Sequence, residues 1–311
     1  MAHPRRFRFG LQLSTAPSGT AWAELARRTE SLGYDTLFLP DHFGDQLAPM
    51  PAMMAAADAT TDLKVGALVF DNDYKHPVVL AKELATIDVL SGGRVQVGLG
   101  AGWMKTDYEQ SGIRQDPPGV RVSRMEEGIA VLKGCFGADA FSYHGQHYSI
   151  TGYDGRPKPL QAPLPLLIGG GAKRVLSIAA REAHIVGINP SILSGQIDAA
   201  AAQDGAAEVT DQKVRWVRDA AGDRYSDLEL NMLQFAAIIT EDRKGTIERM
   251  APLFGLPPEA VETYPHACIG SVEQIADDLR YRRDRWDVSY FVFHGDTMDA
   301  MAPVVAALRD T

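Results

Sequence analysis

Short apolar strands alternate with helical segments along almost the whole chain of 311 residues. The pattern is clearest in the strands Thr36–Leu39 (TLFL) and Arg94–Gly100 (RVQVGLG) and in the helical stretch His76–Leu90. A continuous apolar run of this length is typical of a strand that is buried on both faces of a parallel sheet. Strands that alternate with helices in this way predict βαβ units and therefore an α/β fold.

Eight such strands can be counted in the sequence. The remaining six are Phe7–Leu13, Leu63–Phe70, Pro165–Ile168, His184–Ile188, Leu228–Thr240 and Val288–His294. A count of eight favours a closed (β/α)8 TIM barrel over an open doubly wound sheet. Since no shift in composition marks a domain boundary, we expect a single barrel domain over residues 1–311.

Three stretches exceed what a bare barrel needs, namely Thr106–Gly119, Ala140–Leu164 and Asn189–Thr210. The second contains FSYHGQHYSI, whose alternation predicts a β-hairpin. All three begin after the carboxyl ends of predicted strands, which is the face where barrel enzymes build their active sites. We therefore expect these insertions to shape a pocket.

The charge balance limits the partners of the chain. With 31 Lys and Arg against 40 Asp and Glu, the net charge is −9. No general attraction for nucleic acid or an anionic membrane is expected from such a chain, and we expect a small-molecule substrate instead. Cys135 and Cys268 form no disulfide framework, and no run approaches a membrane span, so a soluble cytoplasmic protein is predicted. His144 and His147 lack a third ligand, so no metal centre is expected.

Two strand ends carry side chains suited to chemistry. Asp41 and His42 follow the second strand, where the imidazole could transfer a proton near neutral pH. The alternative is an ordinary turn with a hydrogen-bonded loop histidine. Val69, Phe70 and Asp71 end the third strand and could form an apolar shelf for a cofactor ring, although Asp71-Asn72 also fits a simple turn.

Glycines mark the end of the fourth predicted strand in the segment GLGAGW, residues 98–103. Without Cβ atoms at Gly100 and Gly102, the backbone there and at Ala101 could approach a flat ring or an anionic chain. The alternative is a strand whose glycines only make room for neighbouring strands. Trp103 and Tyr108 could then close one side of a substrate pocket.

A second glycine cluster opens a predicted helix after the fifth strand. Lys and Arg in the first turn of a helix oppose its dipole, and they fit better if an anion is bound there. We therefore favour a phosphate site over a flexible turn with solvated cations. The residues of this turn are Gly169, Gly170, Gly171, Ala172, Lys173 and Arg174.

Four long segments together resemble the bacterial luciferase-like family of flavin- and deazaflavin-dependent oxidoreductases. They are LGYDTLFLPDH (32–42), HPVVLAKELATIDVLSGGRVQVGLGAGW (76–103), PLPLLIGGGAKRVLSIAAREAHIVGIN (163–189) and IGSVEQIADDL (269–279). The resemblance covers almost the full chain and is strongest to members that use the deazaflavin coenzyme F-420 rather than FMN. It implies a TIM barrel, usually dimeric, with insertions over its mouth.

The resemblance also implies roles for individual residues. Asp41 and His42 match positions that meet the deazaflavin ring and the reacting centre, and Val69 and Phe70 match a bulge, often with a non-proline cis peptide, that supports the ring. Ala101–Trp103 match the segment along the ring and ribityl chain, and Gly169–Arg174 the phosphate turn. Sugar-phosphate dehydrogenases of the family have a glutamate where Trp103 stands, which argues against a sugar-phosphate substrate.

The leading hypothesis is therefore an F-420-dependent oxidoreductase that exchanges hydride between C5 of the deazaflavin and a small organic substrate. One alternative is an FMN-dependent monooxygenase that uses O₂ and reduced flavin from a separate reductase. An alternative of another class is a barrel that carries flavin or deazaflavin without turnover. We expect a homodimer in each case.

Overall fold

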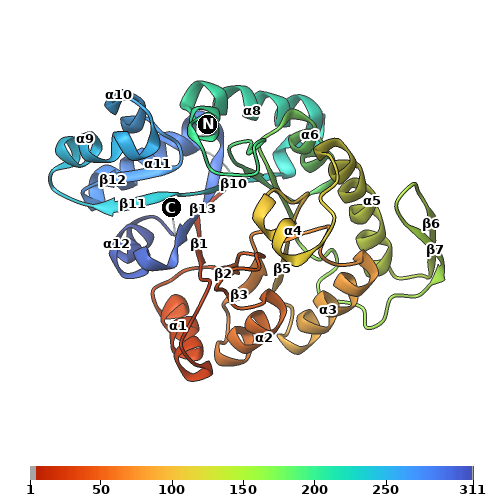
Figure 1. Ribbon diagram of the computed structural model, residues 1–311. Coiled ribbons are helices and arrows are strands. Elements are labelled where there is room, and N and C mark those ends of the chain that lie inside the picture. The colour runs from red at the N-terminus through yellow and green to blue at the C-terminus, as the bar shows by residue number, and fades with distance from the viewer. Residues whose placement is uncertain (1–4, 310) are drawn as a thin grey trace. The chain divides into compact units, whose positions relative to one another are not determined.

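The computed structural model describes residues 5–309 and 311, and these form two compact units (Figure 1). The first unit holds the chain up to Leu13, Arg28–Thr36 and Gly169–Thr311. The second holds Ser14–Arg27 and Leu37–Ile168. Because the two units alternate along the sequence, neither could be recognised as one continuous stretch of chain.

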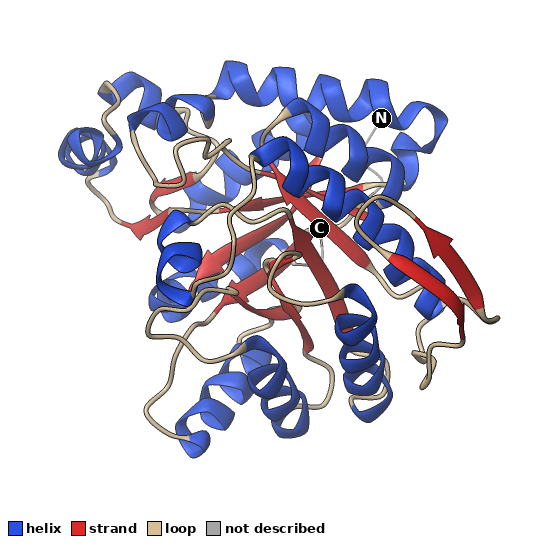
Figure 2. Cartoon of the chain, turned by 45° about the vertical axis from the view of Figure 1, so that its right-hand side comes forward, coloured by secondary structure: helices blue, strands red, loops and turns tan. Residues whose placement is uncertain are grey.

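The second unit is built on parallel strands β2 (Thr36–Leu39), β3 (Lys64–Ala67), β5 (Val95–Gly100) and β8 (Leu166–Gly170). All six residues of β5 are buried, as the apolar run predicts. Its helices are α2 (Pro49–Ala59), α3 (Pro77–Leu90), α4 (Lys105–Ser111) and α5 (Pro118–Phe136), and α1 (Gly19–Ser31) begins in this unit. The predicted hairpin is present as β6 (Phe141–His144) and β7 (Ser149–Tyr153), and it projects outward beside α5 (Figure 2).

The predicted strand Leu63–Phe70 is interrupted in the structure. β3 ends at Ala67, and the short strand β4 (Phe70–Asp71) follows. β3 pairs with β5 through Val65 and Val95, whereas β4 pairs with β5 through Phe70 and Leu99. The peptide bond between Leu68 and Val69, which separates the two strands, is cis. The cis bond expected at this bulge is therefore present.

The first unit has the parallel strand order β1 (Arg8–Gln12), β13 (Val288–His294), β10 (Glu229–Leu233) and β9 (Ile185–Ile188). The β1 and β13 strands align from Arg8 with Tyr290 to Gln12 with His294. Helices and 3-10 turns of this unit are α6 (Lys173–Glu182), α7 (Ala199–Asp204), α8 (Ala207–Ala221), η1 (Gly222–Asp227), α11 (Val272–Trp286), η2 (Gly295–Thr297) and α12 (Met298–Leu308).

The prediction of one strand over Leu228–Thr240 is wrong. β10 ends at Leu233, and the chain then forms β11 (Ala236–Ile239), which pairs with β12 (Ala267–Gly270) in a separate parallel sheet. Helices α9 (Arg243–Phe254) and α10 (Pro258–Glu262) cover this small sheet, around a core that includes Ile247, Tyr264 and Ile269. A continuous apolar run does not reveal that its two halves belong to two different sheets.

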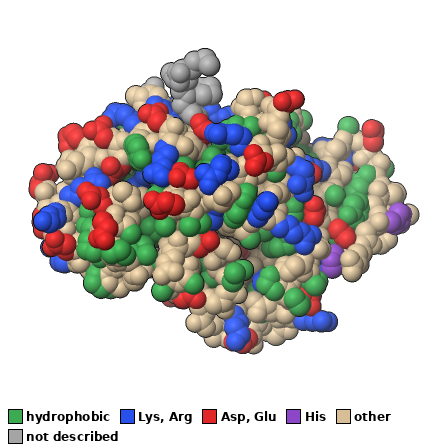
Figure 3. Space-filling view, turned by 90° about the horizontal axis from the view of Figure 1, so that it is seen from above, with side chains coloured by type: hydrophobic (Ala, Val, Ile, Leu, Met, Phe, Trp, Pro, Cys, Tyr) green, Lys and Arg blue, Asp and Glu red, His purple; other side chains and the backbone are tan. Residues whose placement is uncertain are grey.

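The surface agrees with the mixed charge of the sequence. On the face drawn in Figure 3, acidic and basic side chains are interspersed. Within residues 5–309 and 311, no helix combines the length and the apolar character that crossing a membrane requires. Cys135 and Cys268 are both buried and free.

Candidate functional site

The first two predicted residues lie in a loop that follows β2. His42 Nδ1 lies 2.6 Å from Oδ2 of Asp107, which belongs to α4. The same carboxylate accepts hydrogen bonds from the Tyr74 hydroxyl at 3.1 Å and from the Phe43 backbone N–H at 3.3 Å. Because Asp107 acts as acceptor for all of these groups, it favours the His42 tautomer with a proton on Nδ1. Nε2 is then the ring nitrogen that Asp107 does not engage.

Trp103 lies against the imidazole of His42. The two rings are in an edge-to-face arrangement, with centroids 5.5 Å apart and planes at 85°. Such a contact restrains the orientation of the His42 ring by packing alone. The predicted role of Trp103 in binding substrate stays a prediction.

A second hydrogen-bonded group surrounds Asp71 at the end of β4. Its backbone N–H donates to Oδ2 of Asp41 at 3.1 Å, so the loops after β2 and β4 are joined. The Tyr108 hydroxyl lies 2.8 Å from Oδ2 of Asp71 and 3.2 Å from Oδ2 of Asp73. Since a hydroxyl has a single proton, it can donate to only one of these carboxyl groups at a time.

Burial shifts the pKa values of the carboxyl groups at Asp71 and Asp41. Asp71 is 7% exposed, and its burial raises the pKa of its carboxyl to about 7. Burial likewise raises the pKa of Asp41. Nη1 of Arg124, on α5, donates to Oδ1 of Asp73 at 2.7 Å. The Tyr108 hydroxyl therefore lies between the buried carboxyl of Asp71 and the arginine-paired carboxyl of Asp73.

Tyr108 was predicted as part of an open pocket wall, but it is only 2% exposed. Its ring faces the guanidinium of Arg121 at 5.6 Å, and Arg121 also donates to the backbone carbonyls of Ala101 and Gly102. In the structure Tyr108 and Arg121 therefore hold the backbone of Ala101 and Gly102 in place. Contact of Tyr108 with a substrate stays a prediction.

The glycines at the end of β5 have local structural reasons. A Cβ at Gly98 would lie 2.0 Å from the carbonyl oxygen of Ala67, and one at Gly100 would lie 2.6 Å from Cγ2 of Val69. These two glycines make room for the neighbouring strand, which is the simpler of the two interpretations of the sequence. Gly102 has φ +73°, and its Cβ would lie 2.0 Å from the Tyr108 hydroxyl. The backbone at Gly102 therefore rests directly on the buried Asp71–Tyr108 pair.

The predicted phosphate turn lies in the first unit. β8 ends at Gly170, and α6 begins at Lys173 with Ala172 as its N-cap. No side chain caps this end, and the first turn contains no acidic residue. A Cβ at Gly171 would lie 2.4 Å from the backbone nitrogen of Ser191, so only glycine fits there. Backbone N–H groups at an uncapped helix start are suited to an anion.

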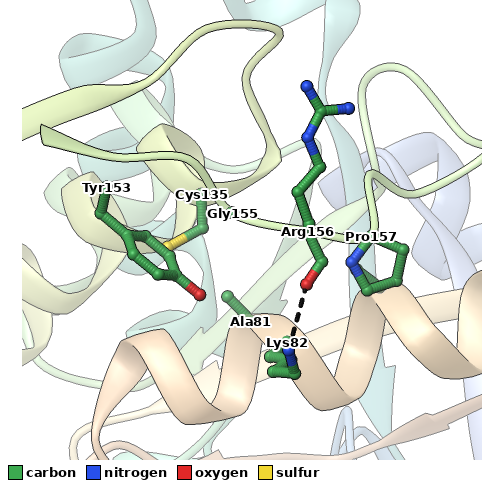
Figure 4. Close-up of a pocket in the computed structure, with 8 residues that line it drawn as sticks. Ala81, Lys82, Cys135, Tyr153, Gly155, Arg156 and Pro157 are labelled. Carbon is green, nitrogen blue, oxygen red and sulfur yellow. Dashed lines mark hydrogen bonds between the residues drawn. The ribbon is translucent and has the colours of Figure 1, made fainter.

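A small hollow also occurs in the second unit (Figure 4), but it has no room for a molecule of even the size of water. It is lined by Ala81, Lys82, Ala85, Cys135, Tyr153, Gly155, Arg156 and Pro157, and Nζ of Lys82 donates across it to the Arg156 carbonyl at 3.4 Å. Ligand pockets usually measure roughly 300–1,000 Å³. This hollow contains none of the predicted site residues and is too small for a flavin ring system.

The sequence missed the groups that hold the predicted residues in place. Asp107 lies against His42 and accepts a hydrogen bond from Tyr74. Asp73 and Arg121 contact Tyr108, and Arg124 in turn donates to Asp73. The available signal for Asp107 was its position one residue before Tyr108, inside an insertion at the mouth of a barrel. The other residues gave no signal, because their contacts depend on how α4 and α5 pack.

The chain has the TIM-barrel fold of known solved structures. A coenzyme F-420-dependent tetrahydromethanopterin reductase from Methanopyrus kandleri matches with a TM-score of 0.77, over 98% of this chain and 100% of that chain, at 16% identity. An F-420-dependent secondary alcohol dehydrogenase, in complex with an F-420–acetone adduct, matches over the same shares with a TM-score of 0.79 and 16% identity. The predicted fold class is thereby confirmed.

The chain belongs to the luciferase-like monooxygenase family, whose sequence profile matches residues 5–286. An FMNH₂-dependent dimethylsulfone monooxygenase of Pseudomonas putida is 32% identical over 192 residues, which are 56% of this chain and 53% of that protein. The chain thus spans about half the length of this curated relative. An uncharacterised protein of Mycobacterium bovis is 28% identical over 78% of this chain and 97% of its own length.

Proposed function

We propose that this protein is an F-420-dependent oxidoreductase that transfers hydride between C5 of the deazaflavin and a small organic substrate. The observation that carries the proposal is the His42–Asp107 pair beside Trp103, because it combines an oriented proton-transfer group with an aromatic wall. Two of the solved structures with the same fold are named as F-420-dependent enzymes, and one of them holds an acetone adduct of the coenzyme.

The residues present fit such a cofactor in each unit. In the second unit, Val69, Phe70 and the backbone of Ala101–Trp103 would contact the ring, with Asp41, Asp71 and Gly100 beside them. In the first unit, the turn from Gly169 to Arg174 offers uncapped N–H groups and two cationic side chains to an anionic tail. An anion at the start of α6 would also offset the unfavourable position of Lys173 and Arg174 in its first turn.

The deazaflavin, when bound, supplies the hydride donor or acceptor. The task of this chain is then to orient the substrate and to move a proton to or from its oxygen. With Nδ1 held by Asp107, His42 would accept the proton of an alcohol at Nε2 when the substrate is oxidised. In the opposite direction the imidazolium would return that proton to a carbonyl oxygen, and Asp107 would stabilise the imidazolium.

A titration with both cofactors tests this proposal. We expect F-420 to bind more tightly than FMN and to be reduced or oxidised by members of a panel of alcohols, aldehydes, ketones and enones under anaerobic conditions. Tight binding of FMN without binding of F-420 would reject the deazaflavin assignment. Binding of F-420 without any turnover over the panel would favour the carrier alternative.

An FMN-dependent monooxygenase is the second candidate. It is supported by the 32% identity to an FMNH₂-dependent monooxygenase, although the match covers 53% of that protein. Consumption of O₂ in the presence of reduced FMN, a flavin reductase and a substrate would select it. F-420-dependent turnover that is unaffected by the removal of O₂ would reject it.

We also propose that the protein is a cytoplasmic homodimer. Two free cysteines fit a reducing compartment. Leu90 at the end of α3 is 64% exposed and Leu160 is 60% exposed. A Cβ on Gly93, which directly follows the turn after α3, would lie 3.9 Å from that of Leu160. Large apolar side chains as exposed as Leu90 and Leu160 support contact with a second copy.

A further inference from the structure

Two asparagine side chains of the first unit have unsatisfied oxygens. Asn231 lies on β10 and Asn189 directly follows β9. Oδ1 of each is buried and has no hydrogen-bond partner among the described residues. Asn231 as a whole is 1% exposed. Buried polar atoms in native proteins are nearly always paired, so these oxygens indicate a missing donor.

Both amides approach the same point above Gly187 on β9. Asn231 is level with Gly187 in the β9–β10 register. A Cβ built on Gly187 would lie 3.6 Å from Oδ1 of Asn231, 3.6 Å from Nδ2 of Asn189 and 3.1 Å from Cα of Gly169. The absence of a side chain at Gly187 therefore lets an amide acceptor and an amide donor converge beside the Gly169–Gly171 turn.

The positions of both amides are fixed by other contacts. Nδ2 of Asn231 donates to the Tyr290 carbonyl at 3.2 Å, which determines the side from which its Oδ1 can accept. The backbone N–H of Asn189 donates to the Gly170 carbonyl at 3.0 Å, and its carbonyl accepts from Nζ of Lys213 at 2.9 Å. The two side chains are thus presented on a rigid backbone, which is the arrangement that a recognition site needs.

We propose that Asn189 and Asn231 bind the part of the cofactor that presents a hydrogen-bond donor next to an acceptor. This inference rests on the proposed function, since flavins and deazaflavins have such groups at the imide edge of the ring and along the ribityl chain. A phosphate does not fit these residues, because the unsatisfied atoms are acceptors and would repel an anion. The asparagine pair is therefore distinct in chemistry from the anion-binding turn beside it.

Binding measurements with truncated cofactors test this proposal. The probes are riboflavin and 8-hydroxy-5-deazariboflavin, which have ring and ribityl chain, and lumiflavin, which has the ring alone. We expect Asn189→Ala and Asn231→Leu each to weaken binding of the ring-and-ribityl probe by roughly five- to one-hundred-fold. Gln203→Ala, which removes an exposed amide from α7, is the control and should leave the affinity unchanged.

Comparison of the probes identifies the group that is bound. If the variants weaken the binding of lumiflavin equally and leave the binding of an N3-methylated flavin unchanged, the asparagines bind the ring edge. A loss confined to the ribityl-containing probe assigns the polyol. Unchanged affinities for all probes would overturn the proposal and leave a buried water as the partner of the two oxygens.

Two further outcomes separate this inference from the proposed function. If the unaltered protein binds neither a flavin nor a deazaflavin, both proposals fail together. If it binds one of them and the variants bind equally well, only the asparagine assignment fails. Thermal unfolding shows whether the Asn231→Leu variant is folded. If it is not, binding by Asn189→Ala, at a partly exposed position, tests the asparagine assignment.

Discussion

Nδ1 of His42 lies 2.6 Å from Oδ2 of Asp107, although 65 positions separate the two residues in the sequence. The carboxylate reaches the imidazole because α4 begins directly after the Ala101–Trp103 segment and turns its first acidic residue back toward the loop after β2. The contact fixes the orientation of the residue proposed to transfer the proton.

Replacing Asp107 is expected to impair turnover more than binding. Asp107→Asn should lower kcat by about 100-fold or more, the usual contribution of general acid–base catalysis, with little change in the affinity for cofactor. His42→Ala should have at least as large an effect, and the double variant should lose no more than His42→Ala alone. Tyr74→Phe, which removes only one donor to Asp107, is the matched control and should have a smaller effect. Unchanged turnover by His42→Ala would show that His42 is not the acid–base group.

The stability of the protein is expected to depend on pH through Asp71. Its pKa is raised from 3.8 to about 7, so the folded state holds this proton more tightly than the unfolded state. The free energy of unfolding therefore falls as the pH rises toward 7, and this group lowers it no further at higher pH. Relative to Asp71→Asn, the wild type should lose up to about 3 kcal/mol of unfolding free energy between pH 5 and 8.

Urea unfolding of both proteins over this pH range measures the difference. Asp58→Asn, at an exposed position on α2, serves as the control and should follow the wild type. Parallel pH profiles of Asp71→Asn and the wild type would show that Asp71 is ionised in the folded protein at neutral pH.

Two glycines with similar backbones are expected to respond differently to alanine. Gly102 has φ +73° and would place a Cβ 2.0 Å from the Tyr108 hydroxyl and 2.2 Å from Oδ2 of Asp71. Gly112 has φ +76° and would place its Cβ in open space. Gly112→Ala should therefore cost about 1–2 kcal/mol from the backbone alone, and Gly102→Ala roughly 1–3 kcal/mol more from the clash. Equal losses in urea unfolding would contradict the tight packing at Gly102.

The turn before α6 is expected to distinguish cofactors by their charge. Lys173→Ala and Arg174→Ala should each weaken binding of FMN or F-420 by several-fold at low salt, and less at high salt. Binding of the corresponding uncharged ring-and-ribityl compounds should not change. Lys244→Ala removes an exposed cation from α9 and should alter neither. If the uncharged compounds weaken equally, the turn does not bind the phosphate.

The proposed homodimer is expected to depend on the exposed apolar side chains near the end of α3. Leu90→Lys and Leu160→Lys should shift the mass measured by light scattering from dimer toward monomer, because each places a charge in an apolar contact. Leu253→Lys, at another exposed apolar position, should not affect the mass. A wild-type protein that remains a monomer at micromolar concentration would reject the dimer.

The strands were predictable because each is a short apolar run between helices. Thr36–Leu39 and Val288–His294 are found with the predicted bounds. Helix α2 was missed because its sequence, PMPAMMAAADA, is apolar on all sides and shows no helical period. Leu228–Thr240 was misinterpreted because a single apolar run serves β10 in one sheet and β11 in another.

The sequence by itself determined the alternation of strands and helices, the strand ends that carry Asp41, His42 and Asp71, and the glycine turn before α6. These features depend on residues close together in the chain. Only the tertiary structure decided that Asp107 binds His42, that Tyr108 is shared by Asp71 and Asp73, and that Asn189 and Asn231 converge above Gly187. Those contacts join distant segments, and their distances follow from how helices and strands pack, which the local sequence pattern does not specify.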